Sequence, residues 1–186
     1  MRNRSSYDPN EDAGVYAPPA NATSRALTMG VIFGLIGVVL NVIINFLSVP
    51  AYANQAREAS AGPWTYLALG LGCLALIINI VLCFIAGFIT GKRIIVRRPA
   101  FWTGVVAVAI IYIASFLLRY IPGYPGNISG QQYSGQVAGG IAVELVILVI
   151  GCLFGGIFSQ WGAIRATLNH PYYYGAEEEE EEEEGE

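Results

Sequence analysis

The amino-acid sequence predicts an all-α integral membrane protein, a bundle of four transmembrane helices. Hydrophobic residues make up 54% of the 186 residues and charged residues only 13%, whereas about a quarter of the residues in a soluble domain are charged. The apolar residues gather in four long runs, each sufficient to cross a hydrocarbon core of roughly 30 Å as a helix. Four of the ten basic residues lie in one short connector, which orients the whole chain.

Residues 1–25 precede the first apolar run and are rich in polar residues and turn formers. This composition cannot bury enough apolar surface to offset the entropy of ordering, so it predicts a disordered cytoplasmic arm. The first span is expected over 26–49, with Pro50 ending the helix. A signal peptide cleaved near Ala51–Ala53 is the disfavoured alternative, because the apolar run exceeds the ~7–15 residues of such signals.

Three further apolar runs predict spans over 64–90, 100–118 and 137–164. The segment 50–63 joins the first span to the second, and the segment 121–136 joins the third span to the fourth. Both contain proline, glycine and polar residues without an apolar period. Such segments are typical of loops outside the hydrocarbon region. We therefore expect both of them to lie on the outer side of the membrane.

The connector over 91–99, with the sequence GKRIIVRRP, sets the predicted topology. It carries four cations, which are Lys92, Arg93, Arg97 and Arg98. By the positive-inside bias this connector lies on the cytoplasmic side, which places both termini there as well. Eight of the ten basic residues then fall inside, and Arg57 and Arg119 fall outside. The sequence therefore predicts a multi-pass protein of the plasma membrane.

The acidic residues are concentrated at the C-terminal end, where nine of the 14 lie between Glu177 and Glu186. The formal net charge of −4 therefore describes this end rather than the transmembrane domain expected over 26–165. Eight consecutive glutamates repel one another, so residues 166–186 are predicted to form a disordered cytoplasmic tail. A solubilising end is the favoured interpretation, and docking to a basic cytoplasmic partner is the alternative.

Two of the apolar segments resemble each other. Ala75–Thr90 aligns without gaps against Glu144–Ser159, which pairs Cys83 with Cys152 and Gly87 with Gly156. This alignment favours an internal duplication, in which the spans form two helical hairpins of the same orientation, a parallel repeat.

Small residues recur at a spacing of four in each span. The pairs are Gly30 with Gly34, Gly87 with Gly91, Ala100 with Gly104, and Gly151 with Gly155. Residues four apart share a helix face, and small ones let two helix backbones approach closely in lipid. We expect packing within one chain, and the interface of a homo-oligomer is the alternative.

A set of polar side chains lies within the predicted spans and consists of Asn41, Asn45, Asn79 and Glu144. A charged side chain in the bilayer is costly, so Glu144 is expected to face the bundle or water, with Arg119 as a neighbouring cation, or to be protonated. We favour hydrogen bonds between helices as the role of this set. The alternative is a polar pocket, open to the outside, that binds a proton or a cation.

The sequence contains no recognisable catalytic or metal-binding constellation. It has one histidine, its three cysteines lie within apolar runs, and no pair of carboxylates lies at membrane depth. We therefore expect no enzymatic activity, no metal, no cofactor and no nucleic-acid partner, with the lipid bilayer as the surroundings. The favoured function is structural, assembly or regulatory. A small transporter or channel-like protein is the alternative, and a membrane enzyme acting on lipid is disfavoured.

Overall fold

The computed structural model describes residues 21–55, 57–58, 60–95, 97–125, 137–168 and 170, and for 137–144 it describes the backbone only. This part of the chain contains four α-helices and no strands. The helices are α2 (Ala22–Gln55), α3 (Pro63–Ile94), α4 (Arg98–Leu118) and α5 (Val137–Ala166). Each is long and apolar enough to span a membrane. The predicted class, an all-α protein of four membrane-spanning helices, is confirmed.

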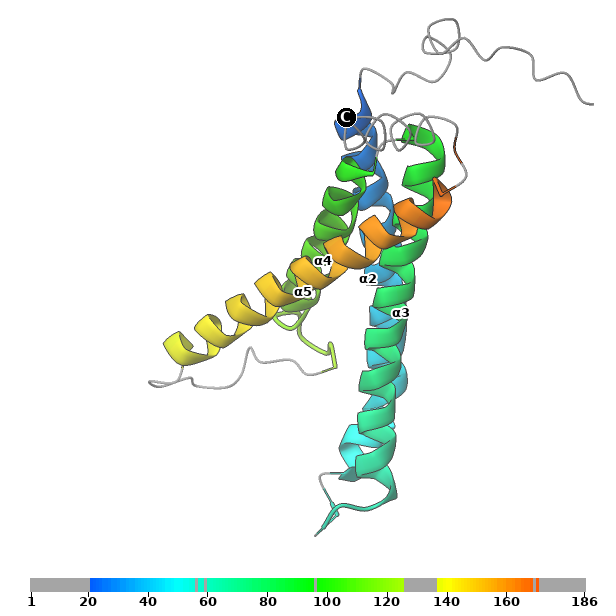
Figure 1. Ribbon diagram of the computed structural model, residues 1–186. Helices are drawn as coiled ribbons and strands as arrows, with labels where there is room; N and C mark the ends of the chain where they lie inside the picture. Colours follow the sequence, from blue (N-terminus) through cyan, green and yellow to red (C-terminus); the bar gives the residue numbers. More distant parts are fainter. Residues whose placement is uncertain are drawn as a thin grey trace, which may run out of the picture.

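The four helices alternate in direction, so α2 and α4 run one way and α3 and α5 return (Figure 1). The closest packing joins α3 to α5 and α2 to α4, while α4 with α5 and α2 with α3 form the hairpin contacts. The order around the bundle is therefore α2, α3, α5, α4. Two hairpins of the same orientation lie side by side, with the equivalent helices of each in contact.

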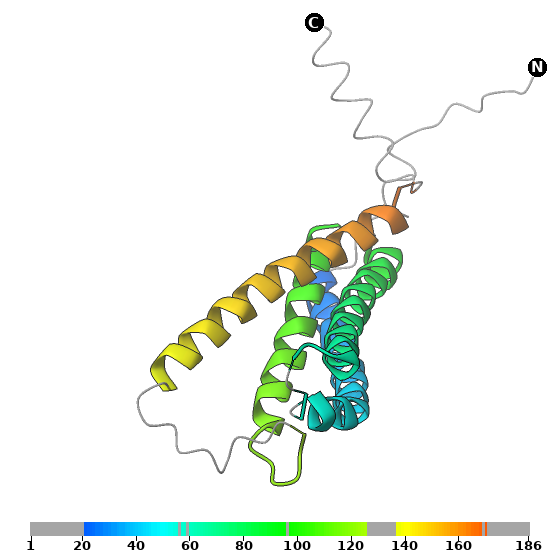
Figure 2. The same cartoon turned by 90° about the horizontal axis from the view of Figure 1, so that it is seen from below.

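The two ends of the bundle differ in how tightly the helices pack. We call the end that carries the α3–α4 connector the basic end, and the opposite end, where α2 joins α3, the far end. Helix α5 crosses α3 near the basic end and diverges from it toward the far end (Figures 1 and 2). The bundle is therefore closed at its basic end and opens between α3 and α5 in its other half.

Small residues occupy the inside of the bundle and large apolar residues cover its outside. Ala26, Ala86, Ala100 and Ala163 are completely buried. By contrast, Leu69 is 67% exposed, and many other leucine, isoleucine and valine side chains are about half exposed. Lipid tails are as apolar as leucine, so helices in a membrane associate by close backbone packing rather than by burying large side chains.

Helix α2 differs from its predicted bounds at both ends. It continues through Pro50 to Gln55, so the expectation that Pro50 ends the first span is wrong. Proline removes one backbone donor, and a membrane helix tolerates this loss where neighbouring groups satisfy the freed backbone. Beyond the proline, Asn54 Nδ2 donates a hydrogen bond to the Pro50 carbonyl at 2.9 Å, within the last turns of the helix. The helix also begins at Ala22, within the segment that the sequence assigned to the cytoplasmic arm.

The connector between α3 and α4 is shorter than the predicted range of 91–99. Helix α3 continues to Ile94 and α4 begins at Arg98, so Gly91, Lys92 and Arg93 are helical. Basic side chains in the last turn of a helix are favourable because they face the negative end of its dipole. Residues 1–20 and 171–186, which include most of the predicted arm and tail, lie outside the described residues.

Candidate functional site

The contact between α2 and α4 depends on Gly30 and Gly34. A Cβ added to Gly30 would lie 2.8 Å from the Thr103 carbonyl oxygen, and one added to Gly34 would lie 3.0 Å from Ile110 Cβ. The first distance leaves no room for a side chain against backbone. The two glycines therefore set the approach of α2 to α4.

The contact between α3 and α5 is closer still. Gly87 lies directly against the Ser159 backbone, and a Cβ on Gly91 would lie 2.8 Å from the Ala163 Cα. On the other side of α5, Gly104 lies against the backbone of Gly155. All of these contacts are within one chain. The interface of a homo-oligomer stays a prediction for the same residues.

Gly151 differs from the other predicted packing glycines. A Cβ at this position would make an ordinary contact, 3.4 Å from Val108 Cγ1. Two other close glycines on α5 were not among the predicted packing residues, Gly156 against the Phe101 ring and Gly162 against the Phe84 carbonyl. In the sequence, Gly156 stood out only as the position that aligns with Gly87 in the two similar segments. Both glycines lie in the glycine-rich part of α5, and this composition is the sequence feature that could have indicated them.

Three completely buried hydroxyl groups connect the helices at the basic end. Thr103 Oγ1 on α4 donates to the Ala26 carbonyl of α2 at 3.0 Å and lies 3.5 Å from Thr90 Oγ1 on α3. Ser159 Oγ on α5 donates to the Ala100 carbonyl of α4 at 2.6 Å. These residues were not predicted as a site. Thr90 and Ser159 appeared only as equivalent positions of the aligned segments.

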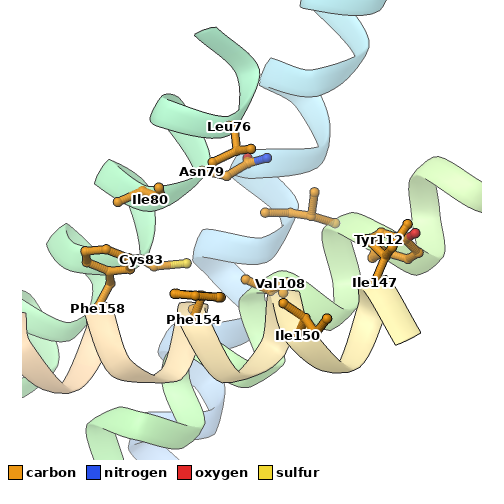
Figure 3. A pocket seen from close by; sticks show the side chains of 13 residues that line it. Leu76, Asn79, Ile80, Cys83, Val108, Tyr112, Ile147, Ile150, Phe154 and Phe158 are labelled. Carbon is orange, nitrogen blue, oxygen red and sulfur yellow. The ribbon is translucent and has the colours of Figure 1, made fainter. Parts of the chain in front are cut away.

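An apolar cavity lies beyond this closed end, where α5 diverges from α3. Its volume is about 560 Å³. Figure 3 shows its wall, which α3, α4 and α5 supply; the lining residues are Leu76, Asn79, Ile80, Cys83, Val108, Ile111, Tyr112, Ile147, Ile150, Gly151, Phe154, Gly155 and Phe158. Small-molecule sites in proteins typically have volumes of roughly 300–1,000 Å³ and mainly apolar walls with few polar groups. This cavity has both properties.

The predicted asparagines form two separate contacts. Asn41 Nδ2 donates to Asn79 Oδ1 at 2.8 Å, which links α2 to α3, and also to the Gly37 carbonyl at 2.8 Å. Asn45 Nδ2 instead donates to the Tyr124 hydroxyl at 2.9 Å. Among these asparagines Asn79 lines the cavity, whereas the residues that line it do not include Asn41 or Asn45.

The two charged residues of the predicted polar set, Glu144 and Arg119, belong to α5 and to the end of α4. The Glu144 backbone belongs to α5, but its side chain lies outside the described residues. Arg119 directly follows α4 at the far end, and its backbone N–H donates to the Phe116 carbonyl at 3.3 Å. The polar pocket at Glu144, which the sequence offers as the alternative, therefore stays a prediction.

The predicted topology-setting cations surround the α3–α4 connector. Lys92 and Arg93 are exposed on the last turn of α3, and Arg98 is the first residue of α4. Arg97 Nε donates to Thr167 Oγ1 at 3.0 Å, which ties the connector to the end of α5. The connector and the end of α5 are thus held together at the basic end.

No group of three or more His, Cys, Asp or Glu side chains that could hold a metal ion occurs in the part of the chain that the structure describes. Comparison of the chain with protein-family models, with curated proteins and with solved structures finds no match. The class that the fold defines is therefore a four-helix membrane protein with a closed basic end and an apolar cavity.

Proposed function

We propose that this chain is a non-enzymatic, multi-pass protein of the plasma membrane with a structural, assembly or regulatory role, and that it acts by receiving an apolar molecule in the cavity between α3, α4 and α5. The cytoplasmic side is assigned to the basic end, because Lys92, Arg93, Arg97 and Arg98 gather there. The single observation that carries the proposal is the cavity itself.

The tight packing at the basic end holds α3, α4 and α5 in place beside the cavity. Glycine contacts and buried hydroxyl groups fix α3, α4 and α5 against one another at the basic end. The same helices diverge in the other half, where Ile80, Phe154 and Phe158 face the shared space (Figure 3). A rigid anchor beside an apolar space suits the reversible uptake of a hydrocarbon group, because uptake need not disturb the anchor.

The experiment fills part of the cavity with a larger side chain of the protein itself. In the Gly151→Leu variant a larger side chain enters the cavity, and the ordinary contact at Gly151 indicates that the first added carbon fits. Native mass spectrometry of the full chain, released from detergent, counts the phosphatidylcholine molecules retained by each protein. The wild type is expected to retain bound lipid, and the Gly151→Leu variant is expected to retain at least one molecule fewer.

The matched control is Gly70→Leu on α3. Nothing lies within 4 Å of a Cβ at Gly70, which is exposed, so this variant adds the same side chain outside the cavity. It is expected to retain lipid as the wild type does. Equal retention by all three proteins would overturn the proposal.

The second candidate function is a small transporter or channel-like protein for a proton or a cation. One observation favours it, the Asn79 amide on the cavity wall, which is held by the hydrogen bond from Asn41. This function needs a titrating group, for which Glu144 is the candidate. The stability of the wild type and of Glu144→Gln should then differ in pH dependence, and superimposed curves would exclude this role for Glu144.

A further inference from the structure

A ladder of aromatic rings joins α3 to α5 at the basic end and carries a cation at each of its two ends. Lys92 Nζ lies 4.9 Å from the centre of the Phe88 ring. The Phe88 ring stacks on the Phe84 ring at 6.5 Å, and the Phe84 ring meets the Trp161 ring edge-on at 5.4 Å. The guanidinium carbon of Arg165 lies 5.8 Å from the centre of the Trp161 ring.

The ladder faces outward rather than into the bundle. Trp161 is 48% exposed, Lys92 and Arg165 are exposed, and Phe84 and Phe88 are half-buried. In a membrane-spanning bundle such apolar surface contacts lipid tails. Long basic side chains at helix ends extend toward the headgroups while their stems stay on apolar surface. The ladder therefore presents rings at tail depth and cations at headgroup depth.

The ladder also continues into the cavity. The Phe158 ring lies on the cavity wall and is 6.3 Å from the Trp161 ring (Figure 3 shows Phe158). On α3 the spacing of four extends from Lys92 through Phe88 and Phe84 to Ile80, which also lines the cavity. One apolar path thus leads from the cations to the cavity.

The charge at this end is of one sign in the described residues. Arg25, Arg93, Arg97 and Arg98 lie near the same end as the ladder. Glu58, whose carboxylate is the one acidic side chain that the structure describes, lies at the far end of the bundle. Basic sites between membrane helices on the cytoplasmic side are suited to anionic lipid headgroups.

We propose that the face formed by Lys92, Phe88, Phe84, Trp161 and Arg165 binds an anionic phospholipid of the cytoplasmic leaflet. Its phosphate lies at Lys92 and Arg165, and a hydrocarbon tail follows the rings toward Phe158 and the cavity. This inference rests on the proposed function, because it names the molecule that the cavity receives. The cations complement a negatively charged headgroup, and the apolar path suits a hydrocarbon tail. Together these two features favour a phospholipid over a partner helix.

The experiment compares two lipids with identical tails, phosphatidylglycerol and phosphatidylcholine, titrated onto the full chain in detergent and followed by native mass spectrometry. The wild type is expected to bind phosphatidylglycerol more tightly. A basic side chain that contacts the anionic headgroup directly is expected to change the affinity by about fivefold, so Lys92→Gln should lose about that factor and the double variant with Arg165→Gln about 30-fold.

The matched control is Arg93→Gln. It removes the same charge at the same end, one residue along α3, from a residue outside the ring ladder. It is expected to keep the preference for phosphatidylglycerol. Equal affinity of the wild type for the two lipids, or an equal loss in Arg93→Gln and Lys92→Gln, would overturn the inference.

A further variant, in which Glu177–Glu184 are replaced by glutamine, tests whether the acidic segment itself occupies the site. A preference that emerges only in this variant would overturn the inference for the full chain. The two proposals fail separately. Loss of the headgroup preference in Lys92→Gln, with normal lipid retention in Gly151→Leu, would overturn the cavity proposal and leave the headgroup site standing.

Discussion

Gly87 of α3 lies directly against the backbone of Ser159 in α5, with no space between them for a methyl group. The same serine donates its hydroxyl hydrogen bond to the Ala100 carbonyl of α4. One position on α5 therefore fixes two neighbouring helices. This arrangement closes the basic end and so defines where the cavity begins.

Replacing Gly87 by alanine should strongly destabilise the bundle. The added methyl would overlap the Ser159 backbone, which cannot rotate away as a side chain can, so α5 must move. Overpacking of this kind costs about 1–3 kcal/mol. The measurement is the thermal midpoint in detergent. Gly70→Ala, in open space on the same helix, should be neutral or slightly stabilising, and equal midpoints for both variants would contradict the packing described here.

The hydrogen bond from Asn41 to Asn79 should contribute a measurable coupling between α2 and α3. A double-mutant cycle with Asn41→Leu and Asn79→Leu is expected to give about 0.6–1.7 kcal/mol, the range for such bonds in membrane proteins. The readout is unfolding in mixed micelles. The control cycle pairs Asn79→Leu with Asn45→Leu, because Asn45 bonds to Tyr124 instead, and these two changes should be additive.

Removal of the Thr103 hydroxyl should destabilise the basic end. Thr103→Val keeps the shape but leaves the Ala26 carbonyl without this buried donor, which costs about 1–3 kcal/mol. The control is Thr28→Val, because the exposed Thr28 hydroxyl bonds to the Ser24 carbonyl of its own helix. If both variants unfold at the same temperature, the hydroxyl of Thr103 does not join α4 to α2.

Glu58 caps the start of α3 from the connector before it. Its carboxylate accepts the backbone N–H groups of Gly62, Trp64 and Thr65 at 3.2 Å each and the Thr65 hydroxyl at 2.9 Å. Desolvation acts to raise the pKa of Glu58, but the hydrogen bonds from Thr65 and from the three backbone groups outweigh it and lower the pKa below its ordinary value of 4.5.

Because the folded-state pKa is lowered, the cap contributes stability above the unfolded pKa of 4.5 and loses it as pH falls through the folded value. Glu58→Gln should therefore be less stable than the wild type at neutral pH. The difference should shrink below about pH 4.5. Thermal unfolding at a series of pH values checks this, and a difference that is constant with pH would argue against an ionised cap.

Ile95 ends α3 with φ at 67°, a region that β-branched residues rarely adopt. Its backbone N–H donates to the Gly91 carbonyl at 2.9 Å, which holds this conformation. Glycine at a helix C-terminus removes the steric cost, so Ile95→Gly should raise stability by about 1 kcal/mol. Ile94→Gly, at a buried position in normal helical conformation, should lower it. A destabilised Ile95→Gly would show that side-chain contacts outweigh the strain.

The membrane-spanning helices could be predicted because their signal is local. A run of about 20 apolar residues defines a span whatever it packs against. The ends were less predictable. Pro50 was expected to end the first span, whereas the helix continues through it to Gln55, because a membrane helix tolerates the loss of one backbone donor.

The site could be predicted only in part, because these helices are apolar all round. A helix in water reveals its buried face by hydrophobic periodicity, but lipid removes that contrast. Glycine spacing pointed to Gly87 and Gly91, yet it did not distinguish Gly151, which borders the cavity instead of a tight contact. Asn41 and Asn45 share a helix face, but their hydrogen bonds go to different partners.

By itself, the sequence determined four apolar helices and the concentration of cations at one end, because composition along a short stretch suffices for both. Only the tertiary structure decided that α3 packs on α5 through Gly87 and Ser159, that Thr103 reaches α2, and that α5 then diverges to leave the cavity. The physical reason is that close backbone packing depends on how the surfaces of two helices fit together. The sequence of one helix does not determine which surface of another helix it meets.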